Sequence, residues 1–130
     1  MPEKTSVRLL YFLHTLLELV LGAVKLRGTY SGVDLDRDCA TGVGASAAKF
    51  AQHHGVSLLS LAALGGLVLL RRETHTAAGG IASATLAIFH GSAVAVMLHA
   101  SHLPVVIIHT PFAIGFAFHA FVIGTGTKDE

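Results

Sequence analysis

Four long apolar runs, separated by short polar segments, dominate the chain. They cover approximately residues 8–26, 47–70, 77–100 and 105–124. A helix needs about 20 mostly apolar residues to cross the hydrocarbon of a bilayer, and each run has about that length. A membrane span must also satisfy its backbone hydrogen bonds internally, which favours helices. The pattern predicts a single all-α domain over residues 1–130, an integral membrane four-helix bundle with one longer loop, about residues 28–46.

The composition agrees with a membrane protein. Hydrophobic residues make up 52% of the chain and charged residues 13%, whereas soluble domains carry about 25% charged residues. The formal net charge is +1 and the basic residues form no stripe, so nucleic acid is not an expected partner. We expect the protein to contact the lipid bilayer and other membrane protein subunits.

Charge in the tails and loops predicts the orientation. Four spans place both termini on one side of the membrane. The second loop lies on the same side as the termini. Together the two tails and this loop carry five of the nine Lys and Arg residues, including the Arg71–Arg72 pair between two spans. Because positive charge accumulates in cytoplasmic loops, we predict that both termini lie inside.

Small side chains mark a packing face on the third span. Four of them follow one another at steps of four residues: Ser83, Ala87, Gly91 and Ala95. Such a stripe lets another helix approach closely, so we predict that Gly91 lies against a helix rather than against lipid.

Glu18 is the most informative polar residue, because it interrupts the first apolar run near its middle. A carboxylate at that depth is costly in lipid and is expected to face the protein interior. His14, Gly22 and Lys25 share its helix face. We predict that Glu18 meets a donor, either His14 on the same helix or His90 on the third span.

Depth along each span sorts the nine histidines. Depth along a helix follows from its rise of about 1.5 Å per residue, and on this measure His90 lies near mid-span, like Glu18. The predicted polar core is therefore His14, Glu18, His90 and His119. A second group lies nearer the first loop and offers possible haem or metal ligands: His53, His54, His99 and His109.

These residues leave several chemical interpretations open. Glu18 and His90 are suited to relay a proton or bind a cation. Histidines at matched depth are suited to ligate haem b. The second histidine group is suited to bind a transition metal, together with loop residues Asp34, Asp36, Asp38 or Cys39. The plain alternative is that Glu18 and His90 hold helices together by hydrogen bonds.

Motifs of soluble catalysis are absent: the chain has no HExxH, GxSxG, P-loop or CxxC sequence. An enzyme acting on a lipid inside the bundle is the weakest of the alternatives. The sequence favours a non-catalytic accessory or structural subunit of a larger membrane assembly. The alternative is a proton or cation transporter, or a redox protein that binds haem or metal through Glu18 and the histidines within the membrane.

Overall fold

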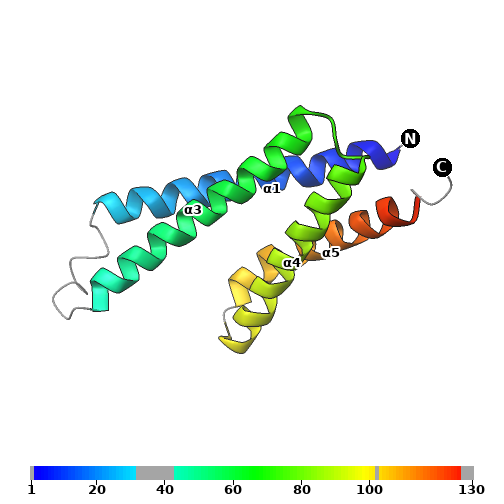
Figure 1. The fold of residues 1–130 in the computed structure, drawn as a ribbon. Coiled ribbons are helices and arrows are strands. Elements are labelled where there is room, and N and C mark those ends of the chain that lie inside the picture. The colour runs from blue at the N-terminus through cyan, green and yellow to red at the C-terminus, as the bar shows by residue number, and fades with distance from the viewer. Residues whose placement is uncertain (1, 32–42, 102, 127–130) are drawn as a thin grey trace. The chain divides into compact units, whose positions relative to one another are not determined.

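The computed structural model describes residues 2–31, 43–101 and 103–126, which form four helices (Figure 1). In chain order these are α1 (Pro2–Ser31), α3 (Val43–Leu70), α4 (Ala77–His99) and α5 (Leu103–Gly126). The predicted all-α class with four spans is confirmed. Helices α1, α3 and α5 extend beyond the predicted spans, most of all α1, whereas α4 ends one residue before the predicted limit at residue 100. The predicted longer loop lies largely outside the described residues.

Each helix contains a segment long and apolar enough to cross a membrane. The four segments are Thr5–Leu26, His53–Leu70, Ala77–His99 and Leu103–Ile123. Large apolar side chains are exposed on all four helices, for example Val24, Leu70, Ile88 and Phe118. Water would disfavour such a surface and lipid accepts it, as expected of an integral membrane protein.

The chain divides into two compact units. Residues 1–13 and 65–130 form unit 1, and residues 14–64 form unit 2. Unit 1 therefore contains the start of α1, the end of α3 and all of α4 and α5. Unit 2 contains the remainder of α1 and α3.

In unit 2, two glycines allow α1 and α3 to pack closely. A Cβ atom added at Gly22 would lie 2.9 Å from the Leu59 side chain and 3.1 Å from the carbonyl oxygen of Gly55. A Cβ atom added at Gly55 would lie 3.1 Å from Leu26. In lipid, helices associate largely by such van der Waals packing, so the missing side chains bring the two backbones together.

The turn from α3 to α4 is closed by its own backbone. Arg72 has a φ of 59°, and its N–H donates to the carbonyl of Leu69 at 3.1 Å. The N–H of Glu73 donates to the carbonyl of Val68 at 2.9 Å. This pair of bonds is a Schellman motif, which satisfies the last carbonyls of α3. Thr76 then caps α4, because its hydroxyl oxygen accepts from the N–H of Gly79 at 3.3 Å.

A shorter turn joins α4 to α5. Ser101 has a φ of 56°, in the left-handed region that favours glycine, and its N–H donates to the carbonyl of Leu98 at 3.1 Å. Pro104 is the second residue of α5. Proline suits this first turn, where its missing N–H would have no helical partner.

The small-residue stripe on α4 is only partly enclosed. Ser83 is buried, Ala87 and Gly91 are half-buried, and Ala95 is exposed. A Cβ atom added at Gly91 would meet no other atom within 4 Å among the described residues. The close helix approach that we predicted at Gly91 is therefore not seen in the described part of the chain, and the wider stripe stays a prediction.

Candidate functional site

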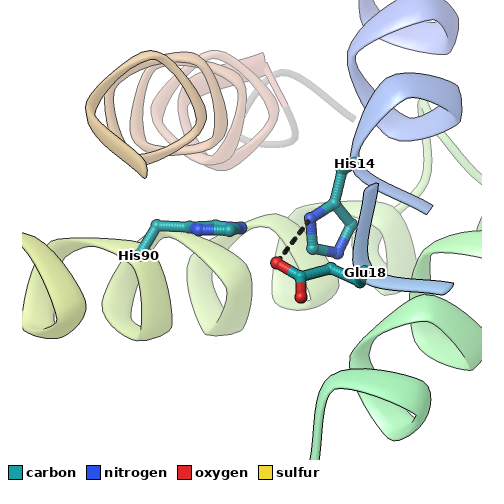
Figure 2. A group of neighbouring side chains, drawn as sticks. All are labelled: His14, Glu18 and His90. Carbon is teal, nitrogen blue, oxygen red and sulfur yellow. Dashed lines mark ion pairs between the residues drawn. The ribbon is translucent and has the colours of Figure 1, made fainter. Parts of the chain in front are cut away.

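His14 and Glu18 form a buried polar pair on α1, in unit 2. Both side chains are fully buried, and Nδ1 of His14 lies 3.9 Å from Oε1 of Glu18. Figure 2 shows them on the same side of the helix, as four-residue spacing requires. Glu18 thus faces inward and approaches His14, one of its two predicted partners. His90, also drawn in Figure 2, belongs to α4 in unit 1, so its pairing with Glu18 stays a prediction.

A second histidine pair lies inside unit 1, between α4 and α5. Nδ1 of His90 lies 2.7 Å from Nδ1 of His109, and the two side chains are 0% and 8% exposed. At this distance the two nitrogens share one hydrogen, so one Nδ1 donates it and the other accepts it. The sequence placed these residues in different groups, and the structure joins them.

Aromatic rings surround His90. The Phe112 ring lies 5.2 Å from the His90 ring at an interplanar angle of 26°, and the Phe116 ring lies 6.1 Å away at 9°. Phe89 meets His90 edge-on, with ring centroids 5.2 Å apart. Aromatic faces attract cations, so a stacked position of this kind is favourable for a protonated imidazole.

A third polar group connects α1, α4 and α5 within unit 1. The Tyr11 hydroxyl donates to the carbonyl of Gly79 at 2.9 Å and lies 2.6 Å from the Ser83 hydroxyl. The Ser83 hydroxyl lies 2.7 Å from Nδ1 of His119. The Tyr11 ring also packs edge-on against Phe116, with centroids 5.0 Å apart. All these side chains are buried, so the group ties three helices together.

Sequence reasoning did not include Tyr11 among the polar core residues. Its signal was present in the spacing of Tyr11, His14 and Glu18, at steps of three and four along one helix face. We had also assigned Ser83 only to a packing stripe, whereas its hydroxyl links two other polar side chains. The four predicted core residues are all buried: His14, Glu18 and His90 at 0% exposure and His119 at 4%.

Several of these side chains are of types that bind metals. Imidazole nitrogens and a carboxylate oxygen suit Zn²⁺ and other transition metals, and His14, Glu18 and His90 each bring one into a buried position. The Nδ1 atoms of His90 and His109 do not fit this role as they stand. Two nitrogens bound to one tetrahedral metal ion lie about 3.3 Å apart, from a metal–nitrogen bond of about 2.0 Å, and these are 2.7 Å apart.

The other predicted ligands are more dispersed. His53 and His99 are exposed and His54 is half-buried. Ser57 donates to the backbone carbonyl of His53 at 2.9 Å. A metal site that joins the second histidine group stays a prediction. The acidic and thiol partners considered for it lie outside the described residues: Asp34, Asp36, Asp38 and Cys39.

Comparison with known proteins found no matching family model, no matching curated protein and no matching solved structure.

Proposed function

We propose that the protein binds and transfers protons inside the membrane, with His90 and His109 as the central proton-holding pair. The 2.7 Å contact between their Nδ1 atoms, buried between α4 and α5, carries the proposal. Ionisable residues inside a membrane are costly and commonly mark proton or ion pathways. Histidine is the side chain whose ordinary pKa lies nearest to neutral pH.

The proton count of the pair supports this role. Two neutral imidazoles have four ring nitrogens and two protons, and one of those protons occupies the Nδ1–Nδ1 contact. A third proton can bind at a remaining nitrogen, which gives one cationic and one neutral ring with the central hydrogen bond intact. The rings of Phe112 and Phe116, stacked near His90, favour the cationic form.

Glu18 and His14 supply a second pair of proton-binding groups in unit 2. They are buried and lie 3.9 Å apart on one face of α1. A buried carboxylate is costly unless it is paired or protonated, so this pair is also suited to take up and release a proton. The proposal assigns both pairs to proton transfer, because Glu18 and His90 each lie near the middle of a span in the sequence.

Proton flux into vesicles tests the proposal. The purified protein is reconstituted into liposomes that contain a pH-sensitive dye, and a potassium gradient with valinomycin sets the membrane potential. We expect the wild type to carry protons faster than protein-free vesicles. Glu18→Gln and His109→Gln keep hydrogen-bonding capacity and are expected to lower the flux by about a hundredfold, the usual contribution of a positioned proton-transfer group.

The matched control is His53→Gln, since His53 is exposed and its side chain joins neither buried pair. Its flux should equal that of the wild type, and circular dichroism should show the same helix content in all variants. If wild-type flux equals that of protein-free vesicles, or if His109→Gln conducts like the wild type, the proposal is wrong.

Two other predictions are tested on the same sample. A Soret band in the visible spectrum would establish haem, and metal analysis would establish whether a transition metal is bound. The accessory-subunit role stays a prediction. The exposed leucine, isoleucine and phenylalanine side chains would suit a partner subunit, but they suit lipid equally well.

A further inference from the structure

Unit 1 contains an open pocket of about 570 Å³ that the proton-transfer proposal does not use. The start of α1, the turn before α4 and the last part of α5 form its walls. Apolar side chains line most of it, including Val7, Leu10, Phe118 and Val122. His75, from the turn, also lines the pocket and is exposed, so it lies at the mouth. Sites for small molecules have volumes of about 300–1,000 Å³ and mostly apolar walls, so the pocket is large enough for an alkyl chain.

The turn from α3 to α4 brings positive charge to the mouth of this pocket. Residues 71–76 contain two arginines, Arg71 and Arg72, and one carboxylate, Glu73. Both arginine side chains are exposed, and in the described part of the chain neither forms an ion pair with Glu73. His75 follows Arg72 by three residues, so their Cα atoms are at most about 11 Å apart. An arginine side chain is long enough to cover most of that distance, so its guanidinium can reach the mouth.

The turn and the pocket lie at the same level of the membrane. The apolar segment of α3 ends at Leu70, directly before the arginines, and that of α4 begins at Ala77. Of the pocket residues, Val7 lies near the start of the first apolar segment and Val122 near the end of the last one. The pocket therefore lies just inside the boundary between hydrocarbon and water, and the turn lies at the level of lipid head groups.

We propose that unit 1 binds an anionic phospholipid, with one acyl chain in the pocket and the phosphate at Arg71, Arg72 and His75. Guanidinium and phosphate form charge-assisted hydrogen bonds, and an imidazole N–H can also donate to a phosphate oxygen. A zwitterionic head group lacks the net negative charge that the turn attracts. The predicted orientation, with the termini inside, places the site in the leaflet where anionic lipids concentrate. The inference does not depend on proton transfer by His90 and His109.

Photolabelling in nanodiscs of phosphatidylcholine tests the inference. Two probes carry the same diazirine-bearing acyl chain, one on phosphatidylglycerol and one on phosphatidylcholine, and each is added at the same low mole fraction. Mass spectrometry locates the labelled residues, which we expect within residues 6–10 and 115–123. The phosphatidylglycerol probe should label these residues roughly 25-fold more than the phosphatidylcholine probe, about fivefold for each arginine beside an anionic lipid.

Two charge variants separate a site from general surface charge. Arg72→Asn removes one charge and introduces a residue that tolerates the φ of 59° at this position. It should lower labelling by the phosphatidylglycerol probe about fivefold. The matched control is Arg8→Gln, since Arg8 is exposed at the same end of α1. Arg8 lies two residues before Leu10 and therefore on the opposite side of the helix from the pocket, so its loss should leave the labelling unchanged.

A second pair of variants tests the position of the acyl chain. Val122→Phe should fill the pocket and reduce labelling by both probes, whereas Val96→Phe, on the exposed face of α4, should leave it unchanged. Equal labelling by the two probes in the wild type would overturn the proposal. An equal loss in Arg8→Gln and Arg72→Asn would also overturn it, because it describes attraction to a charged surface. Unchanged labelling in Val122→Phe would do the same, because the chain would then lie outside the pocket.

Discussion

Replacing Gly22 and Gly91 by alanine tests how α1 and α3 pack. Both glycines lie inside helices, so both changes gain about 1 kcal/mol of helix propensity. At Gly22 the new Cβ would lie 2.9 Å from two Leu59 carbons and 3.1 Å from the Gly55 carbonyl oxygen. Carbon atoms prefer about 3.5–4.0 Å. At Gly91 the new Cβ would meet no atom within 4 Å.

The expected magnitude follows from the difference between the two variants, in which the shared propensity gain cancels. Overpacking of this kind costs about 1–3 kcal/mol. Gly91→Ala should therefore raise the free energy of unfolding by about 1 kcal/mol, and Gly22→Ala should lie about 1–3 kcal/mol below Gly91→Ala.

Reversible unfolding in mixed micelles, with SDS as denaturant and circular dichroism as the signal, measures both free energies. Equal values for the two variants would refute the packing argument, as would a lower value for Gly91→Ala. A helix packed against Gly91, as the sequence predicts, would make the bulkier Gly91→Leu disrupt assembly. The open space beside Gly91 now predicts that Gly91→Leu does not lower the free energy of unfolding of the single chain.

Two further changes test the polar contacts and the turns of unit 1. Tyr11→Phe keeps the ring against Phe116 but leaves Gly79 and Ser83 without their hydroxyl partner, so the same unfolding assay should show a loss of about 1–3 kcal/mol; an unchanged value would contradict the buried network. Ser101→Gly relieves a left-handed backbone and should raise the unfolding free energy by about 1 kcal/mol, whereas a loss of stability would show that Ser101 does not adopt that conformation.

The helices could be predicted from the sequence because their cause is local. Twenty apolar residues in a row must form a helix in lipid, wherever the neighbouring segments lie. The inward position of Glu18 could be predicted for the same reason, since a mid-span carboxylate has few acceptable surroundings.

The pairing of His90 with His109 could not be predicted in this way. His90 lies nine residues before the end of α4 at His99, and His109 lies six residues after the start of α5 at Leu103. Measured from the turn between the two helices, the depths of His90 and His109 differ by about three residues, or roughly 4.5 Å of rise. Two imidazole side chains are long enough to span that gap. Whether they meet depends on the tilt and rotation of both helices, which the sequence does not give.

The hydrogen-bond chain from His119 through Ser83 to Tyr11 ends at the carbonyl of Gly79. That end determines whether the hydrogen bonds can pass a proton along. A carbonyl oxygen accepts a hydrogen and has none to pass on, so every hydroxyl in the chain points the same way and none can turn back. A proton that enters this hydrogen-bond chain cannot leave it at the Gly79 end, so the chain does not conduct protons. The contact between His90 and His109 is symmetric by comparison, since either Nδ1 can be the donor, and the hydrogen can lie on either side. If the proposed function holds, the His90–His109 pair can take part in proton transfer and the chain that ends at Gly79 cannot.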